Sequence, residues 1–100
     1  MNEQKLKGVL GLAARARQIS AGADACRILI RSGQCGILLM DESTGPNTRK
    51  KTEDLSGKSG IPLMILPAGM IREATGKDNM ILGVAKGGFA DQITGMLAGS

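Results

Sequence analysis

Residues 35–40 read Cys-Gly-Ile-Leu-Leu-Met, a continuous apolar run bounded by Gly33-Gln34 and by Asp41-Glu42. The run has the usual length of a β-strand and lacks the polar alternation of a strand that faces water on one side. A strand that is apolar on both faces must be covered on both sides. The run therefore predicts a central strand with a layer of helices on each face.

Before this run the chain predicts two helices and a short strand. Apolar residues recur at helical spacing from Leu6 to Ala16, which predicts a helix at residues 3–15. Residues 18–20 form a candidate strand. Gly22 opens a second helix at residues 23–32, which Gly33 closes.

After the run, helices and strands continue to alternate. The predicted elements are a polar helix at 47–56 ending near Gly57, a strand at 61–66, a helix at 68–75 closed by Gly76, a strand at 80–85 and a last helix after Gly87-Gly88. This alternation predicts an α/β fold, a three-layer α/β/α sandwich with a central mixed sheet. The expected core residues are Leu10, Leu29, Ile37, Leu39, Ile65, Ile81, Val84 and Ile93. With 100 residues, we expect a single domain spanning 1–100.

The composition argues against several classes of function. Phe89 is the only aromatic residue, so the chain lacks the platform on which RRM-like and cold-shock-like proteins stack bases. It has no His and no Cys-x-x-Cys spacing, so we expect no metal site and no cofactor. Cys26 and Cys35 lie in apolar runs and are expected to be buried thiols.

Catalytic patterns are also missing. Gly57-Lys58-Ser59 resembles the end of a phosphate-binding loop, but Thr52 stands where GxxxxGK[ST] requires glycine. A helix precedes the triplet and a strand follows it, which reverses the order that a P-loop needs. A Ser or Cys nucleophile would lack its usual His base, and no pair of carboxylates stands out. We therefore expect a protein that is not an enzyme.

The chain is expected to be cytoplasmic. Lys5 and Lys7 precede an apolar stretch, but residues 8–14 contain two glycines and run into Arg15 and Arg17, so we do not expect a signal peptide. No segment approaches the length needed to span a membrane.

Positive charge is concentrated near the N-terminus. The chain has 13 basic and nine acidic residues, a net charge of +4. Residues 1–33 account for the whole excess, with Lys5, Lys7, Arg15, Arg17, Arg27 and Arg31 against Glu3 and Asp24. This distribution suggests a polyanionic partner, nucleic acid first and an anionic membrane second. A surface that is basic only for solubility is the alternative.

The second predicted helix has one core side and one polar side. At helical spacing the core side carries Cys26, Leu29 and Ile30, and the polar side carries Asp24, Arg27, Ile28 and Arg31. Two guanidinium groups near a glycine that starts a helix can form a phosphate-binding edge. A solvated amphipathic face is the other interpretation.

Several short motifs together resemble a known family. They are Gly11-Leu12-Ala13-Ala14-Arg15-Ala16, Ser20-Ala21-Gly22, Ile30-Arg31-Ser32-Gly33, Asn47-Thr48-Arg49-Lys50-Lys51, Gly60-Ile61-Pro62, Gly76-Lys77-Asp78 and Gly87-Gly88-Phe89-Ala90. In this order and spacing they are similar to the bacterial YlxQ-type proteins, which belong to the kink-turn-binding ribosomal protein superfamily. The resemblance implies a ribosomal-protein-like α/β/α sandwich that binds RNA. The RNA-binding residues that it implies are Gly22, Ala23, Asp24, Ala25, Arg27, Ile28 and Arg31 of the second helix, and Lys77, Asp78 and Asn79 before the last strand.

The sequence also departs from the family pattern. Kink-turn binders carry Asn-Glu and then a Lys three residues after the Glu, where this chain has Asp24, Ala25 and Ile28. Arg17-Gln18 replaces the usual Gly-Lys. General RNA affinity is expected to survive these changes, whereas kink-turn specificity stays open.

Three hypotheses of function follow. The first is a monomeric, ribosome-associated protein that docks rigidly onto structured RNA, with ribosomal RNA as the expected partner. The second is a protein-protein interaction module that uses the second-helix face, with exposed Ile28 as its support. The third is a small α/β enzyme, which would need a ligand site that the sequence does not indicate.

Overall fold

The apolar run at residues 35–40 forms strand β2 (Cys35–Asp41) in the computed structural model, which describes residues 2–98 of the chain. Every residue of β2 except Gly36 is buried, so the strand is covered on both faces as predicted. The other elements, in chain order, are α1 (Glu3–Arg15), β1 (Ile19–Ala21), α2 (Ala23–Arg31), α3 (Pro46–Ser59), β3 (Leu63–Leu66), α4 (Met70–Thr75), β4 (Ile81–Ala85) and α5 (Gly88–Ala98).

The strands form one mixed sheet in the order β1-β4-β2-β3. β2 pairs in parallel with β3 on one side and antiparallel with β4 on the other. β1 pairs antiparallel with the far edge of β4. The parallel pair is joined by α3, which is the crossover that parallel neighbours require.

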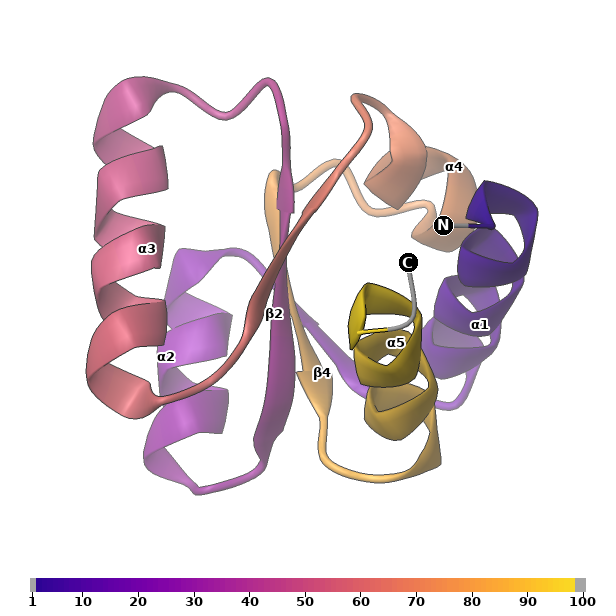
Figure 1. Cartoon of the computed structure of the whole chain (residues 1–100), viewed down its shortest axis with the longest axis horizontal. Coiled ribbons are helices and arrows are strands. Elements are labelled where there is room, and N and C mark those ends of the chain that lie inside the picture. The colour runs from indigo at the N-terminus through magenta and orange to yellow at the C-terminus, as the bar shows by residue number, and fades with distance from the viewer. Residues whose placement is uncertain (1, 99–100) are drawn as a thin grey trace.

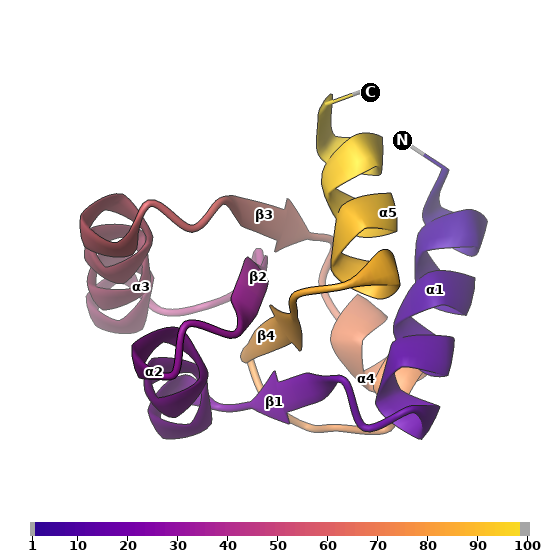
Figure 2. The same ribbon diagram turned by 90° about the horizontal axis from the view of Figure 1, so that it is seen from below.

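Helices cover both faces of the sheet. Figure 1 shows α2 and α3 on one side of β2 and β4, with α1, α4 and α5 on the other, and Figure 2 shows the same layers from below. Alternate residues of β2 belong to two cores. Ile37 and Leu39 lie in the larger core, and Leu38 and Met40 lie in the smaller one. The three-layer α/β/α sandwich with a mixed sheet is thus confirmed.

The structure corrects the predicted end of α3 and the start of β3. α3 continues to Ser59, and Gly60 ends it in the left-handed conformation, with φ of +71°. Gly57 therefore lies inside the last turns of the helix and does not end it. β3 begins at Leu63, not at residue 61, because the paired run starts only after Pro62, which has no N–H to donate.

The burial of two predicted core residues also differs. Six of the eight expected residues are buried, namely Leu10, Ile37, Leu39, Ile81, Val84 and Ile93. Leu29 is only half-buried at the rim of the smaller core. The prediction for Ile65 was wrong, since 39% of its surface is exposed. β3 is an edge strand, and the polar helix α3, whose one described buried residue is Thr52, does not cover Ile65.

Gly36 allows α5 to pack closely on β2. A Cβ added at Gly36 would lie 2.6 Å from the Cβ of Ala90, which is closer than two non-bonded carbon atoms can approach. The β2–β4 register also shifts between Cys35 and Ile37. The glycine in the middle of the apolar run is thus explained by a close helix contact at a strand irregularity.

Leu39 and Ile65 make a matched pair for testing the sandwich. Leu39→Ala should lower the free energy of unfolding by about 2–5 kcal/mol, because it leaves a cavity in the larger core. Ile65→Ala should cost about 1 kcal/mol or less, because the side chain already contacts water. Urea denaturation of both variants measures these changes, and equal losses would contradict the assignment of Ile65 to an uncovered edge.

Candidate nucleic-acid interface

The start of α2 and the segment before β4 lie side by side. The backbone N–H of Gly22 donates to the carbonyl of Ile81 at 2.9 Å, at the end of the β1–β4 ladder. A Cβ added at Gly22 would lie 3.3 Å from the side-chain nitrogen of Asn79. The antiparallel pairing of β1 with β4 therefore brings together the two predicted parts of the RNA-binding surface, although they are far apart in the sequence.

The α2 edge, defined as residues 22–28, presents backbone donors to solvent. Gly22 is the N-cap, with φ of +93°, a conformation that favours glycine. Within residues 2–98, no side chain accepts a hydrogen bond from the first turn of α2. The first N–H groups of a helix have no partner inside it, and the helix dipole adds positive potential there. Asp24 is the acidic residue of this turn.

The cationic and apolar side chains of α2 lie along one exposed face. Arg27 donates from Nη1 to Oδ1 of Asp24 at 2.9 Å, and both side chains contact water. Such an exposed pair is weak, so the guanidinium can exchange the carboxylate for a phosphate. Ile28 is 66% exposed, and Arg31 lies on the same face about 10 Å from Asp24 along the helix axis. Arg31 thus lies at the opposite end of α2 from Gly22 and Asp24, one turn beyond Arg27 and Ile28.

Residues 77–79 are exposed, and the buried Asp41 lines the same pocket as they do. The Asp41 carboxylate accepts hydrogen bonds from the backbone of Ser43 at 2.7 Å and of Gly69 at 3.0 Å, and also from the Ser43 hydroxyl. The backbone N–H of Asp41 donates to Met80 at 2.8 Å. A pocket of about 210 Å³ lies between Asp41 and residues 77–79. Asp41 therefore connects the ends of three segments beneath the candidate interface.

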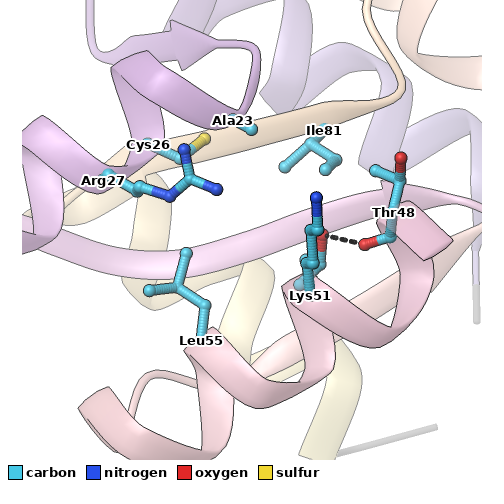
Figure 3. Close-up of a pocket in the computed structure, with 8 residues that line it drawn as sticks. Ala23, Cys26, Arg27, Thr48, Lys51, Leu55 and Ile81 are labelled. Atoms are coloured by element: carbon cyan, nitrogen blue, oxygen red, sulfur yellow. Dashed lines mark hydrogen bonds between the residues drawn. The ribbon is translucent and has the colours of Figure 1, made fainter.

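Sequence reasoning missed the basic side chains that α3 directs toward α2. Figure 3 shows the Lys51 amino group and the Arg27 guanidinium extending into the space between the two helices. Lys58 lines the continuation of this space. Lys51 and Lys58 are seven residues apart, which places them on one face of α3, but the predicted helix ended before Lys58. Equal numbers of acidic and basic residues in this part of the chain also concealed this face.

The two cysteines are structural. Both are free and buried, and burial raises the pKa of the Cys26 thiol to about 12 and also raises the pKa of Cys35. Thiols with a raised pKa are poor nucleophiles at neutral pH. Among residues 2–98 there is no group of three or more His, Cys, Asp or Glu side chains that could hold a metal ion. The same residues include no helix with both the length and the apolar character needed to cross a bilayer.

Two curated relatives match nearly the whole chain. The RNA-binding protein YlxQ of Enterococcus faecium is 27% identical over 99 residues, which cover 98% of this chain and 96% of the relative. The RNA-binding protein YlxQ of Bacillus subtilis (strain 168) is 29% identical over 91 residues, which cover 89% and 91% of the two chains. The chain is thus similar over nearly its whole length to two proteins named RNA-binding protein YlxQ. No protein-family model matches it.

Two solved structures share the fold of this chain. A Bacillus halodurans protein of unknown function superposes on the chain with a TM-score of 0.86 and 30% identity, over 94% of this chain and 97% of its own. The Giardia lamblia 15.5kD RNA binding protein superposes with a TM-score of 0.75 and 13% identity, over 96% and 87%. At that low identity the second match shows a shared fold only.

Acid should reduce the stability that the charged Asp41 side chain gives to the fold. The pKa of Asp41 is lowered, first because the Ser43 hydroxyl donates to its charged form and then because the backbone of Gly69 and Ser43 does so. A carboxylate whose pKa is lower in the folded protein than in the unfolded chain stabilises the fold at pH values above its unfolded-state pKa. This stabilisation is lost as the pH falls, here below about pH 4. Asp41→Asn should therefore be less stable than wild type at neutral pH, with a gap that narrows in acid. Urea denaturation across this pH range measures the gap, and a constant gap would contradict a charged Asp41.

Proposed function

We propose that the protein binds structured RNA with the α2 edge and residues 77–79 acting as one surface. The observation that carries this proposal is the close approach of the Asn79 side chain to Gly22, which sets two distant segments side by side. The name of both curated relatives, RNA-binding protein YlxQ, supports the same class of partner. Ribosomal RNA as the partner, a monomeric state, a cytoplasmic location and a role without catalysis belong to the same proposal.

The proposed mechanism is rigid docking rather than base stacking. Phe89, the only aromatic residue, packs against the larger core and offers no stacking platform. Backbone N–H groups at the start of α2, together with Arg27 and Arg31, would hold phosphates. Lys77 and Asn79 would donate to phosphates or base edges, and Ile28 would contact an unstacked base or a ribose. Structured RNA suits such a surface because it exposes bases at bulges and loops.

Protein-protein interaction by the α2 face is the second candidate function. The exposed side chain of Ile28 favours it, since an apolar residue on a polar helix face can anchor a partner protein. The two functions differ in their dependence on salt. Binding to RNA phosphates weakens steeply as salt rises, whereas an apolar protein contact depends on salt much less.

The arginines of α2 provide the first test. The double variant Arg27→Ala/Arg31→Ala should weaken RNA binding and reduce the slope of log affinity against log salt by roughly one unit per lost phosphate contact. Lys5→Ala/Arg15→Ala is the matched control, because it removes two positive charges from exposed positions on α1, across the sheet. Titration of one structured RNA at several salt concentrations compares the two. An unchanged slope in the α2 variant would mean that these arginines are only solvated.

Kink-turn specificity provides a second test. The triple variant Asp24→Asn/Ala25→Glu/Ile28→Lys supplies the side chains of the kink-turn binders on an exposed or half-buried stretch, so no cavity opens. Each good base contact is worth about 1–3 kcal/mol of discrimination, so the variant should gain at least tenfold for a kink-turn over a plain duplex. Titration of both RNAs at one salt concentration measures this gain.

The wild-type protein is the reference in this comparison. A folded triple variant with no gain would mean that RNA does not dock on the α2 edge as the family resemblance implies. A wild-type protein that already prefers kink-turns would mean that Asp24, Ala25 and Ile28 are compatible with that specificity.

A further inference from the structure

A groove separates α2 from α3 on one face of the sheet. Its first part is a pocket of about 160 Å³ with Ala23, Cys26 and Ile81 on one side and Leu55 on the other. Arg27 and Lys51 extend into this pocket from the two helices (Figure 3). Its second part is a pocket of about 240 Å³ that shares Arg27, Lys51 and Leu55 and continues to Lys58. The groove therefore follows two turns of α3, about 10 Å along its axis.

The groove exists because α3 packs loosely. Its residues are mostly polar, and Thr52 is its one described buried residue. The Thr52 hydroxyl donates to the carbonyl of Thr48 within the same helix at 2.8 Å, so this donor needs no acceptor on α2. Leu55, the large apolar side chain of α3 that lines this space, is only half-buried, so the space between it and Ala23 and Ile81 is not filled.

Positive charge dominates the lining. Three cations, Arg27, Lys51 and Lys58, line the two pockets, against the single carboxylate Asp54. Arg27 has an exposed ion pair with Asp24, but neither Lys51 nor Lys58 forms an ion pair with any carboxylate in the described part of the chain. Unpaired cations that gather along an open groove attract a chain of negative charges.

We propose that this groove carries the RNA backbone beyond the α2 edge, with phosphates held by Arg27, Lys51 and Lys58. The inference rests on the proposed function, because RNA would reach the groove from that edge. Ala23 and Arg27 belong to both surfaces, so a strand leaving the start of α2 enters the groove without crossing another element. The apolar floor suits the sugar faces of a nucleotide chain, whose phosphates then point toward the cationic rim.

The test compares two double variants with the same loss of charge. Lys51→Gln/Lys58→Gln removes the groove cations of α3. Lys50→Gln/Lys5→Gln removes two exposed charges outside the groove, one of them from the residue next to Lys51. At low salt the groove variant should bind a structured RNA at least tenfold more weakly, with a salt slope shallower by about 0.7–0.9 for each lost phosphate contact. The control variant should bind within twofold of wild type.

The outcomes separate this inference from the proposed function. If the groove variant binds like the control while Arg27→Ala/Arg31→Ala weakens binding, the RNA ends at the α2 edge and the inference is wrong. If the wild-type protein binds no RNA, the proposed function fails and the inference with it. A polyglutamate peptide of equal charge is the probe that tests for an acidic polypeptide in the groove. If the peptide binds wild type more tightly than the groove variant while RNA binds both proteins equally, the groove selects protein and the inference is also wrong.

Discussion

Burial of β2 on both faces is the constraint on which the rest of the molecule depends. Ile37 and Leu39 need a helical layer on one side of the sheet, and Leu38 and Met40 need another on the opposite side. One helical layer cannot satisfy both sets, so the chain must place helices before and after the strand on different faces. The two cores are unequal. Three helices contribute buried residues to the larger core, whereas α2 is the helix that contributes to the smaller core.

The candidate interface is a consequence of how β4 is paired. Because β4 lies between β1 and β2, its beginning is adjacent to the end of β1 and to the end of β2. The first pairing sets the start of α2 beside Asn79, and the second sets Asp41 beneath the same segment. Backbone hydrogen bonds from Gly22 to Ile81 and from Asp41 to Met80 thus tie this exposed surface to the sheet. Such support keeps the surface in one shape, as the proposed rigid docking onto RNA would require.

The weak packing of α3 has the opposite effect. The helix closes the parallel β2–β3 crossover but leaves a groove against α2 and leaves Ile65 uncovered. A helix with more apolar residues would have filled this space and removed the cationic lining. Polar residues in α3 therefore reduce the size of the smaller core, and they leave Lys51 and Lys58 beside Arg27.

The sequence by itself determined the layered fold, because apolar periodicity reports local burial. The run at 35–40, the helical spacing in α1 and the glycines at 22 and 76 all predicted elements that the structure contains. The implied surface also came from the sequence: the second-helix edge came from helical spacing and from the family resemblance, and residues 77–79 came from the resemblance alone. Only the tertiary structure decided that these two segments touch, that Ile65 lies at an open edge and that α3 directs lysines toward Arg27. These features depend on strand order and on how closely helices pack, and neither leaves a local pattern because the residues involved are distant in the chain.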